Sequence, residues 1–201
     1  MGTQRYDVLS ARRDRPGLLR PEIHGWRLKA GITAISNLRT FWFEQMNDYL
    51  IRLVTENKRD FFPLLLLGDE SESYIDAYLE RGDLFALYDG DLKSVCVVTD
   101  EGGGVLEIQN LATDVSSQRQ GYASRLIDHI ADHYAGRYDK IILGTGDVPG
   151  VLSFYEKCGF IKTHSIADYF TTHYDHPIIE DGILLKDKVY LERMIAKNPM
   201  P

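Results

Sequence analysis

The sequence has no long apolar run. A membrane-spanning helix needs about 20 consecutive apolar residues, whereas the longest such stretch here, residues 61–67, is interrupted by Pro63. The start of the chain also lacks the basic, apolar and small-residue regions of a secretory signal peptide. These absences predict a chain without a membrane partner.

Cysteine is scarce. The 201 residues include two cysteines, Cys96 and Cys158, and apolar residues surround both. A secreted disulfide framework would need more of them, so we interpret these two as reduced core residues. Because reduced thiols fit a reducing compartment, the expected location is the cytoplasm.

Positive charge is short in most of the chain. The net charge is −7, and it is unevenly divided: residues 1–45 have eight Lys or Arg against four Asp or Glu, and residues 46–201 have 15 against 26. An acidic body disfavours nucleic acid as a partner, because binding there depends on neutralising phosphates. It suits a cationic small molecule or a basic peptide, although an acidic surface without functional meaning is common.

Regular periodicity is missing from residues 1–45 and begins at Met46. We therefore expect residues 1–45 to be a poorly ordered, dispensable extension, or to follow a start codon placed upstream of the true one. Three adjacent aromatic residues, Phe41, Trp42 and Phe43, argue against a free tail. The remainder, residues 46–201, is long enough for one domain.

Within that domain the apolar pattern predicts an α/β fold, with a mixed, mostly antiparallel sheet flanked by helices. Strands are expected at residues 49–54, 84–88, 93–99, 105–113, 141–143, 161–166 and 188–194. Helices are expected at residues 56–67, from Ser71 or Ser73 to Leu79, from about Gly121, and at 148–157. A long polar and aromatic loop separates the last two strands.

The turn between the strand at 105–113 and the following helix has the composition of an anion site. A helix N-terminus presents unpaired backbone N–H groups and the positive end of the helix dipole. Gly121 and Ala123 would let a phosphate approach the backbone, and Arg119 and Arg125 can add positive charge. The alternative is an ordinary helix start closed by polar side-chain caps.

Two motifs here resemble those of the GNAT superfamily of N-acetyltransferases. Residues 118–123, Gln-Arg-Gln-Gly-Tyr-Ala, resemble its Q/R-x-x-G-x-G/A motif, and residues 155–160 resemble its Y-x-x-x-G-F element. Residues 173–183 are similar to a loop in one bacterial subgroup of uncharacterised members. The resemblance implies a GNAT-like acyl-CoA N-acyltransferase fold, with acetyl-CoA as co-substrate and no metal.

The same resemblance implies where acetyl-CoA binds. The thioester arm would lie between the fourth and fifth strands, and the pyrophosphate would contact the amides of residues 119–124. The cofactor-binding residues expected on this basis are Leu111, Ala112, Thr113, Gln118, Arg119, Gln120, Gly121, Tyr122, Ala123 and Ser124.

Tyr155 is the expected general acid. A phenol with an ordinary pKa near ~10 is protonated at neutral pH and can give its proton to the departing thiolate. The alternative is a core tyrosine with a satisfied hydroxyl. Glu107, on the strand that leads to the site, is the candidate base, and a solvated strand glutamate is the alternative.

Two further segments are less informative. In the turn before the helix at 148–157, many GNAT members have an Asn that contacts the pantetheine arm, and this chain has none; Asp147 is expected to cap the helix instead. His173, Asp175 and His176 have zinc-ligand chemistry, but they lack helical register and Pro177 follows. We interpret them as part of a loop that lines the acceptor site.

The predicted function is transfer of an acetyl group to a primary amine of a small molecule or peptide. A protein N-terminus or lysine is a second acceptor class, and a homodimer is one possible assembly. The non-enzymatic alternative is a CoA-binding sensor or interaction domain. A dinucleotide-binding domain fits less well, because the glycine spacing is G-x-A and the neighbouring strands have the pattern of hairpins.

Overall fold

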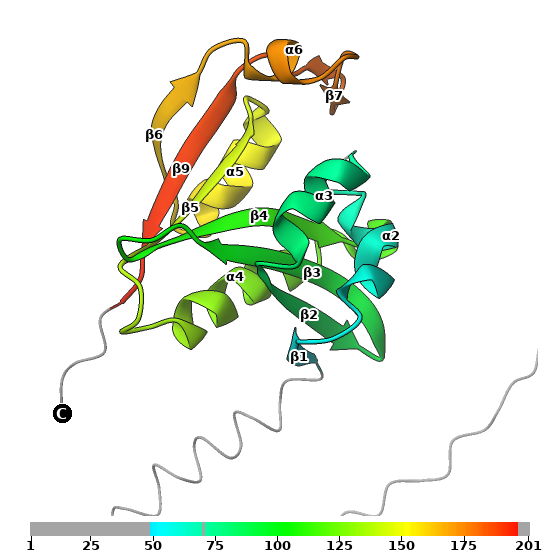
Figure 1. Cartoon of the computed structure of the whole chain (residues 1–201), viewed down its shortest axis with the longest axis vertical. Coiled ribbons are helices and arrows are strands. Elements are labelled where there is room, and N and C mark those ends of the chain that lie inside the picture. Colours follow the sequence, from blue (N-terminus) through cyan, green and yellow to red (C-terminus); the bar gives the residue numbers. More distant parts are fainter. Residues whose placement is uncertain (1–48, 70, 197–201) are drawn as a thin grey trace, which may run out of the picture. The chain divides into compact units, whose positions relative to one another are not determined.

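The computed structural model describes residues 49–69 and 71–196. Their largest element is a seven-stranded sheet in the order β1-β2-β3-β4-β5-β9-β6 (Figure 1). All neighbouring strands pair antiparallel except β4 and β5, which are parallel. The strands are β1 (Leu50–Val54), β2 (Asp83–Asp89), β3 (Asp91–Asp100), β4 (Val105–Thr113), β5 (Lys140–Gly146), β6 (Ile161–Ile166) and β9 (Lys188–Met194).

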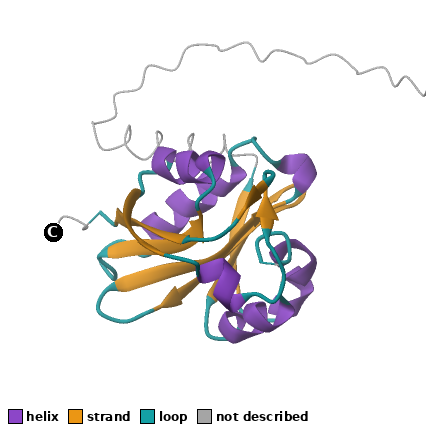
Figure 2. Cartoon of the chain, turned by 90° about the horizontal axis from the view of Figure 1, so that it is seen from above, coloured by secondary structure: helices purple, strands orange, loops and turns teal. Residues whose placement is uncertain are grey.

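Helices cover both faces of this sheet (Figure 2). On one face, α4 (Tyr122–His133) and α5 (Pro149–Lys157) pack against the larger core, which includes Leu106 and Ile108 of β4. On the other face, α2 (Phe62–Leu65) and α3 (Glu72–Leu79) pack against a second core, which includes Ala112 of the same strand. The α/β fold expected from the sequence is therefore confirmed.

A β-bulge in β4 explains how one strand serves both cores. Val97 of β3 pairs with Asn110, whereas the next residue, Val98, pairs with Ile108, so Gln109 is one residue extra in β4. An extra residue reverses the alternation of side chains and bends the strand. Ile108 therefore faces α4, while Asn110 is buried against α2 and α3 and donates to Leu65 O at 2.9 Å.

The bulge lies where β4 parts from β5. The parallel pairing runs from Val105 with Lys140 to Ile108 with Leu143 and stops there. Both strands continue, β4 to Thr113 and β5 to Gly146. The backbone edges that face each other beyond this point are consequently not joined by a strand ladder.

Local structure departs from the sequence-based expectations in three places. The helix expected at 56–67 is divided into the 3-10 helix η1 (Lys58–Phe61) and α2, with Pro63 in the first turn of α2. The loop between β6 and β9 contains a short helix, α6 (Tyr169–His173), and a hairpin of β7 (Ile179–Glu180) with β8 (Ile183–Leu184). The helix at 148–157 begins at Pro149 after Val148, without the side-chain cap expected from Asp147.

Candidate active site

The N-terminus of α4 follows β4 after one 3-10 turn, η2 (Val115–Ser117). The first intrahelical bond is donated by the Arg125 amide to Gly121 O at 3.1 Å, so the amides of residues 122–124 have no acceptor within the helix. No side chain in the described ranges caps this end of α4. The helix start thus lacks the polar caps of the alternative interpretation, and its amides and dipole are available to an anion.

The turn before α4 adopts an uncommon backbone. Gly121 has φ 84° and Arg119 has φ 61°, both in the left-handed region. A left-handed non-glycine residue costs about 1–2 kcal/mol, and such alternation of backbone conformations forms concave sets of N–H groups that bind anions. We call residues 119–124 the anion cradle.

Side chains around the anion cradle hold the turn rather than fill it. Gln118 Nε2 donates to Thr113 O at 3.3 Å, Gln120 Nε2 to Ser116 O at 3.2 Å, and Ser124 Oγ to Gly121 O at 2.9 Å. A methyl group at Gly121 would meet only Ser124 Oγ, at 3.7 Å. The space next to Gly121 is therefore open on the protein side.

Tyr122 anchors the first turn of α4. Its ring is buried and its hydroxyl donates to Asp89 Oδ2 at 2.6 Å, a hydrogen bond that raises the pKa of Tyr122. The Arg125 guanidinium lies over the rings of Tyr49 and Tyr122, 5.0 and 5.5 Å from their centroids. Of the two arginines, Arg125 is therefore held by aromatic rings beside the anion cradle, while exposed Arg119 lies within it.

The residues expected to hold the thioester arm lie on the part of β4 that has left β5. Leu111, Ala112 and Thr113 pair with β3 on one side only. Ala112 O already accepts a hydrogen bond of 2.8 Å from buried Ser94, and Thr113 O accepts the one from Gln118. The side of β4 turned toward β5 has its backbone groups free of a strand partner, as an extended ligand arm requires.

Tyr155 is in the last turn of α5, where the helix ends in a reversed turn. Gly159 has φ 86°, and the Phe160 amide donates to Tyr155 O at 3.0 Å, as in a Schellman motif. The Tyr155 ring is half-buried against the larger core. Its hydroxyl has no hydrogen-bond partner among the described residues. The hydroxyl oxygen is also not fully buried, so part of its surface is accessible. Burial raises the pKa of Tyr155, so the phenol stays protonated at neutral pH.

Glu107 lies on the opposite face of the sheet from Tyr155. It pairs with Thr99 across β3 and β4, on the face covered by α2 and α3, and it is half-buried. Burial raises the pKa of Glu107, although the positive charge of Lys188 opposes that shift. A carboxyl group with a raised pKa can accept a proton more readily than an ordinary glutamate.

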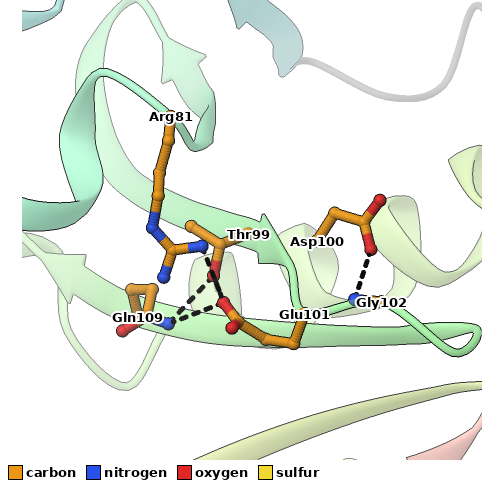
Figure 3. Close-up of polar contacts among 6 residues, drawn as sticks. All are labelled: Arg81, Thr99, Asp100, Glu101, Gly102 and Gln109. Carbon is orange, nitrogen blue, oxygen red and sulfur yellow. Dashed lines mark hydrogen bonds and ion pairs between the residues drawn. The ribbon is translucent and has the colours of Figure 1, made fainter.

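Figure 3 shows the polar cluster around Glu101, whose charge also acts on Glu107, a residue that the figure does not draw. Glu101 accepts hydrogen bonds from Thr99 Oγ1 at 2.6 Å and Gln109 Nε2 at 3.5 Å, and it forms an ion pair with Arg81 at 2.9 Å. The Thr99 hydrogen bond and the Arg81 charge lower the pKa of Glu101. The Glu101 carboxylate is thus already engaged by hydrogen bonds and by an ion pair, whereas Glu107 has no ion pair in the described part of the chain.

The structure adds one residue that sequence reasoning missed. Lys188 of β9 reaches toward Glu107 across β5, where Gly144 leaves room for it. Nothing in the local sequence indicates this, because the approach depends on the pairing of β5 with β9.

His173 stacks on Tyr169 with ring centroids 4.1 Å apart, and its carbonyl accepts from the Tyr74 hydroxyl at 3.0 Å, which ties α6 to α3.

Comparison with known proteins identifies the family. Residues 80–162 match the model of the acetyltransferase (GNAT) domain. The chain is also 37% identical, over 149 residues, to the uncharacterised N-acetyltransferase YvbK of Bacillus subtilis, an alignment that covers 73% of this chain and 96% of YvbK. The chain therefore belongs to the GNAT family of acetyltransferases.

Two solved structures show the same fold with its ligand. An acetyltransferase of Bacillus subtilis in complex with CoA is 36% identical with a TM-score of 0.68, covering 73% of this chain and 98% of that one. A GNAT acetyltransferase of Elizabethkingia anophelis with acetyl-CoA bound is 30% identical with a TM-score of 0.69, covering 74% and 99%. Among the helices described here, none has the length and apolar character to cross a bilayer.

Proposed function

We propose that this chain is an acetyl-CoA-dependent N-acetyltransferase that acetylates a primary amine of a small molecule or peptide. One observation carries the proposal: the β4–β5 ladder ends at Ile108 and Leu143, and the uncapped start of α4 follows the freed end of β4. An extended thioester arm can pair with the freed strand edge while its pyrophosphate meets the anion cradle. The relatives with CoA and acetyl-CoA bound support this assignment.

The two candidate proton-transfer residues lie on opposite faces of the sheet. Glu107 is on the α2–α3 face, and Tyr155 packs against the core under α4 and α5. The sheet separates these faces except where β4 and β5 part. We therefore place the thioester in that opening, with the amine arriving from the Glu107 side and the thiol leaving on the Tyr155 side.

In the reaction, the ammonium gives one proton to Glu107, directly or through water. The amine nitrogen then forms a bond to the acetyl carbonyl carbon, and the bond between that carbon and sulfur breaks. Tyr155 gives its proton to the departing thiolate. The phenolate then recovers the second proton of the nitrogen through solvent, and Glu107 releases the first to solvent, so both residues return to their starting states. Positioning and charge stabilisation supply the rest of the rate.

Both cysteines are free thiols, with Cys96 buried. On that basis we propose the cytoplasm as the working compartment.

The deciding experiment is a thiol-release assay with acetyl-CoA and amines from four classes: aminoglycosides, polyamines, amino acids and short peptides. Acceptor-dependent CoA release, with an acetylated product detected by mass spectrometry, supports the proposal. Tight binding of acetyl-CoA without release by any amine would instead favour a CoA-binding sensor. Absence of CoA binding would remove the anion cradle as well.

A further inference from the structure

Glu107 and Lys188 lie on the α2–α3 face of the sheet, on opposite sides of β5. Glu107 pairs with Ile142, Gly144 with Tyr190, and Gly146 with Lys188. Because alternate residues of a strand share a face, Glu107, Tyr190 and Lys188 project from the same side as the two glycines. Beyond Ile142, the β5 positions on this face are Gly144 and Gly146, which have no side chains of their own.

Lys188 uses this space. A methyl group placed on Gly144 would overlap Lys188 Cε, so the aliphatic stem of Lys188 crosses directly over β5. Its ammonium lies 4.7 Å from the ring centroid of Tyr169 and 5.2 Å from that of Tyr190. Rings within about 6 Å attract a cation through their negative faces. They hold the ammonium between β9 and β4.

The ammonium is held without an anionic partner. No carboxylate oxygen of the described residues lies within 4.0 Å of Lys188 Nζ. Two other carboxylates are already paired: Glu192 of β9 pairs with Lys140 at 2.7 Å, and Glu101, beside Glu107, pairs with Arg81. Glu107 and Lys188 therefore present opposite charges to the same space without neutralising each other directly.

These two charges define a complementary ligand. Building on the function proposed above, we propose that the acceptor is a zwitterionic amine of the amino-acid class, whose ammonium contacts Glu107 and whose carboxylate contacts Lys188. One positive and one negative protein group match one carboxylate and one ammonium. A phosphate would bring about two negative charges beside Glu107, and like charges at short range disfavour binding.

The aromatic setting of Lys188 supports recognition of a ligand rather than of Glu107. A partly buried cation needs compensation for lost hydration. If Glu107 were its partner, direct contact would give the largest gain, yet the two form no ion pair. The rings keep the ammonium separate from Glu107 and leave its N–H donors for a carboxylate.

The test compares acceptors that differ only in the carboxylate. Full-length protein is assayed for acetyl-CoA-dependent thiol release with amino acids, with the corresponding amino-acid amides, and with the decarboxylated amines. The variants are Lys188→Met, which keeps the stem and deletes the charge, and Lys188→Arg, which keeps the charge. Wild type is expected to favour the amino acid in kcat/KM. Lys188→Met should lower that value by about 10- to 100-fold, the loss of one charge-assisted hydrogen bond, and should lower it much less for the amide, and Lys188→Arg should restore part of it.

Three results would overturn the proposal. One is a wild type that favours the amides or the decarboxylated amines. Another is a Lys188→Met variant whose kcat/KM falls equally for all acceptors, with the acid limb of the pH profile shifted equally for each. Lys188 would then act through Glu107. The third is an Lys188→Met variant that retains full preference for the carboxylate.

A binding measurement separates this inference from the proposed function. The melting temperature of the full chain is measured with CoA plus N-acetyl amino acids or their N-acetyl amides. Carboxylate-dependent stabilisation that disappears in Lys188→Met supports the inference even if no amine is turned over. Equal stabilisation by both ligand sets, or none by either, counts against it whether or not the enzyme proves active.

Discussion

The ring of Tyr155 meets the ring of Phe160 edge to face, with centroids 5.7 Å apart and an interplanar angle of 74°. Phe160 is almost fully buried, and the left-handed turn at Gly159 brings it back onto α5. The phenol ring is thereby fixed by its neighbours, while its hydroxyl has no hydrogen-bond partner among the described residues. Packing and proton donation can be separated experimentally at this position.

We expect Tyr155→Phe to lower kcat by about 100-fold, the size of a typical general-acid contribution. The melting temperature and the Kd for CoA should change little, because the ring and its contacts remain. Single-turnover kinetics and calorimetry check the two halves. The matched control is Tyr134→Phe, which removes a buried hydroxyl that donates to Asp83: it should cost about 1 kcal/mol of stability and leave kcat intact. A Tyr155→Phe enzyme as fast as wild type would show that Tyr155 is only a core residue.

A second prediction concerns Gly121 in the anion cradle. Gly121→Val places a β-branched residue at φ 84° and a side chain where a phosphate would approach, so the Kd for CoA should rise by at least about 10-fold. Gly121→Asn tolerates the left-handed backbone and isolates the effect of the side chain.

Gly103→Val is the control for backbone strain alone, because Gly103 has φ 59° and open space around it in the turn before β4. It should lower the melting temperature without changing CoA affinity. If folded Gly121→Val and Gly121→Asn both bind CoA as tightly as wild type, the pyrophosphate does not bind at this turn.

The pH dependence of kcat/KM should report Glu107. Its pKa is raised by burial, and only the ionised form accepts a proton, so activity should fall as the pH drops through a value above the ordinary ~4.3 of glutamate. Glu107→Gln should lower kcat/KM by about 10- to 1,000-fold and abolish that limb. Glu101→Gln, at a carboxylate whose pKa is lowered, should keep it. An unchanged acid limb in Glu107→Gln would exclude Glu107 as the base.

The boundary at Met46 stays a prediction, because residues 1–48 lie outside the described residues. We expect a chain that begins at Met46 to fold and to bind acetyl-CoA as well as the full chain. The measurements are melting temperature with and without acetyl-CoA and limited proteolysis of the full chain. A loss of more than a few degrees, or protection of residues 1–45 from proteases, would show that the segment is packed structure.

Short-range patterns were sufficient for much of this fold. The strand predicted at 105–113 has the bounds of β4, and the strand predicted at 161–166 has those of β6. The start of α4 was predictable because its glycine and its apolar period lie in one short segment. These features depend on residues that are neighbours in sequence.

Features set by distant pairing were not predictable. The bulge at Gln109 does not interrupt the apolar pattern of the β4 sequence. Both faces of that strand are covered, so apolar side chains are buried whichever face they occupy. The position of Lys188 depends on Gly144, 44 residues earlier, and on the register of β5 with β9. Aromatic residues of the polar loop acquire their partners through α6, a helix too short to show a period.

Because Gln109 is the extra residue of the bulge, the number of residues in β4 determines whether the strand bends away from β5. Deleting Gln109 alone would restore regular alternation without changing the face of any residue from Asn110 onward, because Glu107 and Asn110 already share a face on either side of the bulge. Buried Asn110 would stay on the α2–α3 side, but the strand would lose the bend that leads it away from β5. A single-codon deletion would thus convert an open strand pair into a continuous ladder, whereas most substitutions at Gln109 would leave that geometry in place. Sequences descended from this one should therefore vary the side chain at this position more freely than the length of the strand.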